Sequence, residues 1–487
     1  MCLDNGRPTI DIRLAIGALI VKHKMKLSDR DVVAMIQENI YIQYFVGFSS
    51  FNPEASFDPS LFVEMRKRMG AEKFDRMNRE IILAAEGRSK KASSKKKDSS
   101  QEEPPAENSA SASSDKSPAK QSSGPPNQGK LKLDATVADQ LIVYPTDLGL
   151  IARSRWESER LIDLLYKASE LQEKPRTYRR VARKRYLAVA KKRRKTKRVI
   201  RKAIGQQLRY LRRNLSTIEQ LLDLFDNESI PWEFRDFRIY WVIQVIYDQQ
   251  KYMYDNKVKR CDDRIVNIYQ PYVRPIKRGK DKADVEFGAK LGVSEWNGFS
   301  RLNHISWDAY NESGDLVGQV EGYRDWHGYY PEVVLVDQIY LTRANRKYLK
   351  EKGIRHVGPK LGRPAEETPY ERRKRRKERN MRNHVEGKFG QGKNAYGLDE
   401  IRARRQDTSE SWLGGIFLAM NITRVMKIFS ILLILATLVV DLFFAFASAA
   451  CYPRRGLERA MTAIKAKSQA VDKFWDVLFP KKIYVFG

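Results

Sequence analysis

Residues 87–129 constrain the fold more than any other feature of the chain, because they contain almost no side chain that could enter a core. From residue 89 the stretch reads SKKASSKKKDSSQEEPPAENSASASSDKSPAKQSSGPPNQG. Segments so rich in Ser, Lys and Pro bury too little apolar surface to offset the entropy lost on ordering. We therefore predict a disordered linker at 87–129, between an N-terminal domain at 1–86 and a larger domain at 130–425.

The N-terminal domain is predicted to be all-α. Leu14, Leu19 and Ile20 recur at helical spacing, and a second apolar stripe starts at Val32. Ser28, three residues before an acidic side chain, has the spacing of a capping box and places a helix start between the two stripes. Two helices joined by a short turn fit either a DNA-binding helix-turn-helix or an ordinary small bundle, and the pattern leaves both open.

The larger domain is predicted to be α/β. Leu131 and Leu133 alternate with polar neighbours, which indicates a strand that ends at Asp134. The continuous apolar run at 331–336 is typical of a central strand covered on both faces, and Asp337 follows it. Further strands are predicted at 141–144, 273–276, 285–291 and 305–310, and helices at 147–166 and 344–352.

The charge of the chain points to a polyanionic partner. Lys and Arg number 91 against 60 Asp and Glu, a formal charge of +31. Nucleic acid or an anionic membrane surface would offset such self-repulsion, and charge alone does not choose between them. Residues 174–213 hold 19 of these cations and no acid, with apolar residues interleaved, which favours a helix that tracks phosphates.

We therefore expect a basic helical insertion at about 171–258 that contacts DNA. The candidate phosphate contacts are Lys191, Lys192, Arg193, Arg194 and Lys195. The aromatic side chains expected to anchor its core are Trp232, Phe234, Trp241 and Tyr247.

The C-terminal part, 426–487, is predicted to be an apolar helix followed by a basic tail. Residues 428–450 are long and apolar enough to span a bilayer, with Asp441 as their single charge. A carboxylate at mid-membrane is costly, and basic residues flank both ends, so no orientation is indicated. Burial against protein or a second subunit is favoured over spanning. The N-terminus lacks the apolar core of a signal peptide, so secretion is not expected and a cytoplasmic protein is favoured.

Three carboxylates stand out by position: Asp134 and Asp337 at strand ends, and Glu386 at the start of a predicted helix. Side chains at the carboxyl ends of strands converge on one crevice, so these distant residues can form one site. Hard oxygen ligands suit Mg²⁺ or Mn²⁺, and two such ions can serve in-line phosphoryl transfer. Taken singly, each acid is equally compatible with a helix cap or a surface carboxylate.

The sequence resembles the DDE transposases of bacterial insertion sequences, specifically those with an InsH-type helical N-terminal domain and an RNase H-like core. The matching stretches are GRPTIDIRLAIGALIVKHKMKLSDRDVVAMIQENIYIQYFVGF, KLDATVADQLIVYPTDLGLI, VRPIKRGKDKADVEFGAKLG, VVLVDQIYLTRANRKYLKEKGI and HVEGKFGQGKNAYGLDEIRARRQDTSESW. They occur in order throughout residues 6–415, which makes their combination more specific than any one of them.

The resemblance implies that Asp134, Asp337 and Glu386 are the catalytic and metal-binding triad. It also implies a Tyr-Arg-Glu-Lys signature around the third acid. Arg382, Glu386 and Lys393 match that signature, whereas Arg379 stands at the tyrosine position. In such an enzyme Lys393 contacts the transposon-end DNA and Arg382 helps to position the site.

The implied activity is metal-dependent cleavage at transposon ends followed by strand transfer into target DNA. The expected partners are double-stranded DNA and a second copy in a homodimer on DNA, with two metal ions, no small-molecule substrate and no membrane. Two alternatives remain open: a decayed transposase that only binds DNA, and a membrane-associated basic protein. The presence of all three acids favours the enzyme.

Overall fold

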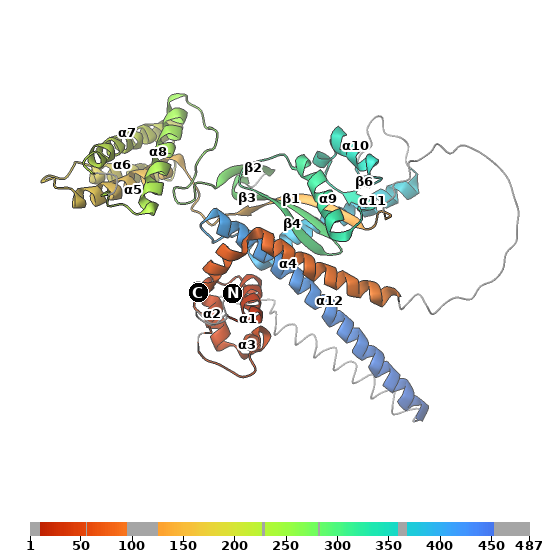
Figure 1. The fold of residues 1–487 in the computed structure, drawn as a ribbon. Coiled ribbons are helices and arrows are strands. Elements are labelled where there is room, and N and C mark those ends of the chain that lie inside the picture. The colour runs from red at the N-terminus through yellow and green to blue at the C-terminus, as the bar shows by residue number, and fades with distance from the viewer. Residues whose placement is uncertain are drawn as a thin grey trace.

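The computed structural model describes residues 10–54, 56–94, 125–225, 229–280, 283–358 and 368–451. Within them, side chains are described except at 88–94, 278–280, 283–284 and 432–451. Three parts are distinguished in Figure 1: a helical N-terminal domain, a mixed α/β domain, and a helical lobe that extends from the α/β domain.

The N-terminal domain consists of α1 (Ile12–Met25), α2 (Asp29–Glu38), α3 (Ile40–Val46) and the long α4 (Leu61–Ser94). The predicted capping box is confirmed, because the Ser28 hydroxyl accepts from the Asp31 N–H and the Asp31 carboxylate accepts from the Ser28 N–H. The helix α4 continues to Ser94, so the first residues of the predicted linker are helical. Extending an existing helix is far easier than nucleating one. Residues 95–124 lie outside the described part of the chain.

A mixed sheet forms the centre of the α/β domain. Its strands are β1 (Lys130–Asp139), β2 (Arg274–Lys280), β3 (Ala283–Trp296), β4 (Phe299–Ser306), β5 (Val333–Leu335) and β6 (Arg355–Val357). Strand β1 is antiparallel to β3 and parallel to β5, and β6 extends the sheet beyond β5. Both β2 and β4 pair with β3. The predicted mixed α/β class is therefore observed.

Helices cover both faces of this sheet. Leu131 and Leu133 of β1 pack with α9 (Asp315–His327) and α10 (Arg343–Glu351). Ala138 of β1 packs on the opposite face, with residues of α11 (Pro369–Tyr396) and α12 (Gln406–Cys451). Successive side chains of a strand alternate between faces, so even-numbered residues of β1 point to the side of α11 and α12.

Two details of β1 differ from the prediction. The strand does not end at Asp134 but continues to Asp139, because Ala135–Ala138 retain the residue types and alternation of a strand. Residues 141–144 do not form a second strand. The edge of β1 is already paired with β3, and after Gln140 the chain turns away toward α5 with Val143 and Tyr144 exposed.

The helical lobe comprises α5 (Asp147–Ala168), α6 (Arg179–Ala190), α7 (Lys197–Leu222) and α8 (Phe234–Asp255). A common core joins α5, α7 and α8, through residues such as Leu161, Leu211 and Ile243. The helical lobe therefore starts earlier than the insertion predicted from about residue 171, because α5 is part of its core. Trp232 is buried as expected, whereas the predicted anchors Phe234 and Trp241 are exposed, because the opposite face of α8 supplies the core residues.

The helix α12 joins the N-terminal domain to the sheet. Leu413 and Phe417 lie in the core beneath the sheet, while Leu418 completes the core of the N-terminal domain. Asn421 exchanges hydrogen bonds of 3.0 and 2.8 Å with the backbone of Ser300 on β4 and donates to Asn78 on α4. These buried contacts hold three elements together that are distant in sequence.

The described part of α12 also has a membrane-like composition. Gln406–Ile431 is long and apolar enough to cross a bilayer, but half of its most apolar window is buried inside the protein. A core helix of a soluble protein passes the same test. Most of the predicted apolar segment 428–450 lies beyond the described side chains, so the choice between burial and spanning there stays a prediction.

Candidate functional site

Two of the predicted acids lie on adjacent parallel strands. Lys132 of β1 is paired with Leu335 of β5, and Asp134 and Asp337 each lie two residues further along. Asp134, an even-numbered residue of β1, points to the face that α11 covers. Asp337 follows β5, where its carboxylate accepts from the Gln338 N–H at 2.7 Å. The strand register thus brings the two carboxylates to the same region of the sheet.

The third acid, Glu386, comes from α11. It lies in the middle of this helix rather than at its start, because Thr368, Pro369 and Glu371 form a capping box that begins the helix much earlier. Arg382 lies one turn before Glu386 on the same helix face. Its guanidinium forms ion pairs with Asp337 at 3.0 Å and with Glu386 at 3.5 Å.

The charge of Asp134 is tied to the same group. Burial and, to a smaller extent, the nearby carboxylates of Glu312 and Glu386 raise the pKa of the Asp134 carboxyl, whereas the Ala135 N–H and the Arg382 guanidinium lower it, and together these effects bring it to about 6. Asp134, Asp337 and Glu386 therefore all interact with Arg382. The three acids predicted from sequence thus lie around one guanidinium group, that of Arg382.

A fourth carboxylate, Glu312, belongs to this region and was missed in the sequence. It lies in the 3₁₀ turn η1 (Glu312–Gly314), where it pairs with Lys290 at 2.8 Å. Tyr340, in the turn η2 (Gln338–Tyr340), is also close: burial raises the pKa of its hydroxyl, and the nearby carboxylates of Glu312 and Asp134 raise this pKa further. Neither residue directly follows a strand, and although Tyr340 lies in the matching stretch VVLVDQIYLTRANRKYLKEKGI, only the tertiary fold reveals that both residues adjoin the acids.

The donor set fits a hard divalent cation. Carboxylate oxygens are the ligands that Mg²⁺ and Mn²⁺ prefer, and a cation bound here would favour the charged form of the half-buried Asp134, which burial and the carboxylates of Glu312 and Glu386 disfavour. In the described residues no three such side chains are already arranged around a metal position. Arg382 lies between Asp337 and Glu386 instead.

In this arrangement Arg382 would compete with a metal ion for the carboxylates of Asp337 and Glu386. We expect Arg382→Ala to bind Mn²⁺ about tenfold more tightly than the wild-type protein in the absence of DNA, since a cation no longer has to displace the guanidinium. Isothermal titration calorimetry would measure this. Arg379→Ala is the matched control. Arg379 lies on the same helix and lines the same hollow as Asp337, but it forms no ion pair with Asp337 or Glu386 in the described structure, so the Mn²⁺ affinity of this variant should not change. Equal affinities for all three proteins would contradict the competition.

A hollow of about 370 Å³ adjoins Asp337 and is rich in arginine. Arg375, Arg379 and Arg382 of α11 line it together with Asp337 and Glu378. Guanidinium groups beside a carboxylate site are suited to hold phosphate oxygens.

Two family profiles match the chain. Residues 1–68 match the family described as Transposase domain (DUF772), and residues 334–426 match the Transposase DDE domain. The second match contains Asp337, Arg382, Glu386 and Lys393. Both matches support an insertion-sequence DDE transposase. This confirms the family resemblance.

A curated relative of the transposase is the Uncharacterized protein ORF8 in nfe locus from Rhizobium meliloti, which is 39% identical over 80 residues. That alignment covers 16% of this chain, and the chain spans 39% of the length of the relative. No solved structure matches the transposase.

The predicted DNA contacts of the transposase lie on two separate surfaces. Lys393 is half-buried on α11, about two turns after Glu386. The five cations Lys191–Lys195 are exposed, but they form a connection between α6 and α7 rather than part of a helix. Consecutive cations provide no apolar face to pack, and Thr196 then caps the start of α7. Figure 1 shows their lobe apart from α11, so they do not join the acidic site.

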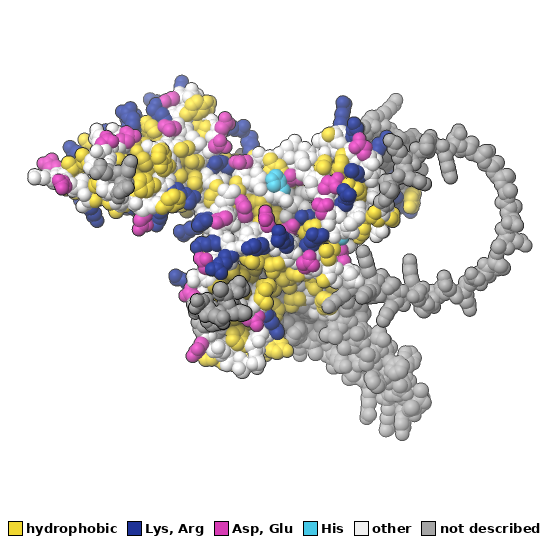
Figure 2. Space-filling model, viewed as in Figure 1, with side chains coloured by type: hydrophobic (Ala, Val, Ile, Leu, Met, Phe, Trp, Pro, Cys, Tyr) yellow, Lys and Arg dark blue, Asp and Glu magenta, His cyan; other side chains and the backbone are white. Residues whose placement is uncertain are grey.

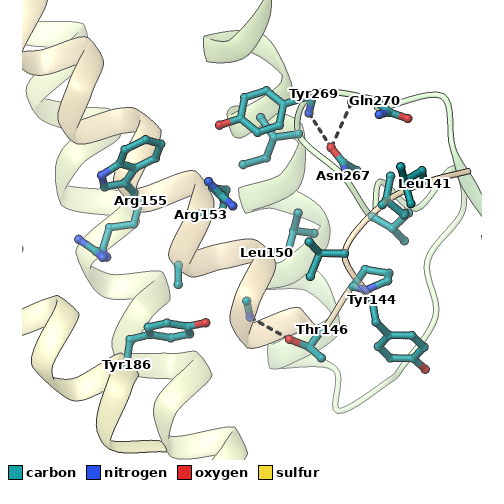
Figure 3. Close-up of a pocket in the computed structure, with 18 of the residues that line it drawn as sticks. Leu141, Tyr144, Thr146, Leu150, Arg153, Arg155, Tyr186, Asn267, Tyr269 and Gln270 are labelled. Carbon is teal, nitrogen blue, oxygen red and sulfur yellow. Dashed lines mark hydrogen bonds between the residues drawn. The ribbon is translucent and has the colours of Figure 1, made fainter. Parts of the chain in front are cut away.

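A second hollow of the transposase, of about 820 Å³, lies where the helical lobe meets the α/β domain (Figure 3). Tyr144 and Trp156 are exposed in its wall, by 72% and 51%, next to Arg153 and Arg183. The Arg153 guanidinium lies 5.7 Å from the centre of the Trp156 ring and 6.0 Å from that of Tyr269. Aromatic rings interleaved with arginine are suited to bind nucleic acid.

Proposed function

We propose that this transposase cleaves DNA at the ends of its element and joins the freed ends to target DNA. The observation that carries the proposal is the grouping of Asp134, Asp337 and Glu386 around Arg382, with the last three inside the matched DDE domain. The arrangement of β1 between antiparallel β3 and parallel β5 supports, as the resemblance implies, an RNase H-like core.

Asp134, Asp337 and Glu386 would hold the metal ions in this proposal. Two bound Mg²⁺ or Mn²⁺ ions would supply activation of the attacking oxygen and stabilisation of the leaving oxygen. The side chains of Asp337 and Glu386 are 59% and 57% exposed, so ions and DNA can reach them. Arg382 then moves from the carboxylates to a DNA phosphate, and Lys393 contacts the transposon end from the same helix.

The remaining basic surfaces would hold the DNA beyond the cleavage site. Lys191, Lys192, Arg193, Arg194 and Lys195 would contact phosphates as an exposed group on the helical lobe. Two DNA ends have to be held together, so we propose a homodimer on DNA as the working form. A cytoplasmic location in contact with the nucleoid follows from a DNA substrate.

The test is cleavage by the wild-type, full-length protein of end-labelled DNA that carries the sequences flanking its own coding region. We expect nicks at the element ends in Mg²⁺, none after chelation with EDTA, and none in a duplex of scrambled sequence. Cleavage that continues in EDTA would overturn the proposal.

A binding-only protein is the second candidate. One observation in its favour is that, among the described residues, no three acids are already arranged around a metal position. The other is that Arg379 stands at the tyrosine position of the signature. The same experiment decides, because a binding-only protein retards the end DNA in a gel but leaves it intact in Mg²⁺ and in Mn²⁺.

A further inference from the structure

The outer face of α8 carries a stripe of exposed apolar side chains. Phe234 is 86% exposed, Trp241 64%, Val245 44% and Tyr252 55%. In Figure 2 apolar side chains gather on the surface of the lobe that α5–α8 form. Large exposed apolar surfaces of this kind mark interaction sites.

The stripe has a regular spacing. Its positions follow one another at intervals of four, three, four, three and four residues, which keeps them on one helix face. In order they are Phe234, Arg238, Trp241, Val245, Asp248 and Tyr252. The opposite face of α8, with Ile239, Ile243 and Ile246, packs in the lobe core, so the stripe plays no part in that core.

The order of residue types in the stripe is symmetric about Ile243. Two aromatic residues, Phe234 and Tyr252, stand at its ends, and Trp241 and Val245 stand on either side of its centre. The two charged residues, Arg238 and Asp248, stand at equal distances from the centre and have opposite signs. Neither forms a hydrogen bond or ion pair within the part of the chain that the structure describes, so both are available to a partner.

We propose that this stripe binds the same stripe of a second copy of the chain, with the two α8 helices antiparallel about a twofold axis level with Ile243. In this register Phe234 faces Tyr252, Trp241 faces Val245, and Arg238 faces Asp248, and the twofold axis repeats each pair. A parallel register would place Arg238 opposite Arg238 and Asp248 opposite Asp248, which repels.

The chemistry of the stripe favours a second copy over DNA. Its one Arg and one Asp cancel, so it lacks the excess of cations that attracts phosphates. Its 22-residue helix is about 33 Å long, and a single helix pair is smaller than the standard interface of about 1,600 Å². We therefore expect this contact to be weak in the absence of DNA and to add to the dimer affinity when two copies bind the same DNA. The need for two copies depends on the proposed function, whereas the choice of this surface depends only on the exposed residues of α8.

Charge reversal tests this pairing by sedimentation of the full-length protein without DNA. Arg238→Asp and Asp248→Arg each place like charges together twice, so we expect each to raise the dimer dissociation constant at least about tenfold. The double variant R238D/D248R restores opposite charges and should return the constant to within about threefold of the wild type. A partner other than this stripe would have fixed charges, and the double variant would not restore binding to it.

Arg235→Asp is the matched control, because this exposed arginine lies on the same helix about 100° away from the stripe. It changes the net charge equally and should leave the dissociation constant unchanged. Since all these positions are exposed, the thermal unfolding of each variant should match the wild type. A monomer at every concentration, single variants without effect, or no recovery in the double variant would each overturn the proposed contact. None of these outcomes depends on DNA cleavage.

Discussion

Replacing Asp337 with alanine is expected to slow Mg²⁺-dependent DNA cleavage by about a thousandfold or more, which corresponds to at least about 4 kcal/mol of transition-state stabilisation. Asp337 is more than half exposed and follows the central parallel strands, so it can hold a metal ion without a rearrangement of the core. The affinity for end DNA should change little, because many cations share the phosphate contacts. Single-turnover cleavage and gel retardation measure the two effects separately.

The matched control is Glu332→Ala, an exposed acid at the opposite end of β5, which should cleave like the wild type. Asp337→Asn is the second variant, since an amide retains the hydrogen bond from the Gln338 N–H but is a poor metal ligand. If Asp337→Asn cleaves normally while the wild type depends on Mg²⁺, Asp337 has no part in the metal site.

Replacing Asp29 with alanine is expected to lower the free energy of unfolding by about 3–5 kcal/mol, because it leaves a buried ammonium group without its counter-charge. Lys22 is only 1% exposed and pairs with Asp29, which also accepts from Arg66 at 2.7 Å. The Lys22 ammonium lies 4.1 Å from the centre of the Trp412 ring on α12. Burial lowers the pKa of Lys22 to about 8, which shows how strongly this position disfavours charge.

Lys22→Met is the comparison that isolates the charge effect. It removes the buried cation but leaves the pair of Asp29 with Arg66, so it should destabilise the protein much less than Asp29→Ala. Urea unfolding followed by tryptophan fluorescence measures both, because Trp412 is part of the cluster. Equal losses for the two variants would mean that packing, and not the unpaired charge, dominates.

Local patterns predicted the elements well where one face is apolar. The capping box at Ser28, the helix after residue 146 and the buried strand before Asp337 all follow from neighbours in the sequence. The extent of β1 and the irregular backbone at 141–144 did not, because they depend on pairing with β3, more than 140 residues away. Strand pairing over such distances leaves no local signal.

The candidate site was predictable only in part. Asp134, Asp337 and Glu386 were picked out by position and family resemblance, and the structure brings them to one cation. The sequence did not predict that Arg382 pairs with these acids, or that Glu312 lies near them. Nor did it predict that Trp241 is exposed. All three features depend on how side chains from different helices and strands pack together. Periodicity alone treats an aromatic residue on a helix as part of the core, so it could not separate Trp232 from Trp241.

The position of α12 has a consequence for the order in which the chain can fold during synthesis. N-terminal domains generally fold first, as they leave the ribosome. Here the core of the first domain includes Leu418, and Trp412 covers its buried Lys22. That core is complete only after residue 418 has been translated. In a nascent chain the core of the N-terminal domain therefore stays incomplete until nearly the whole DDE domain has been made. A chain that terminates upstream of α12 lacks the α12 residues that complete this N-terminal core.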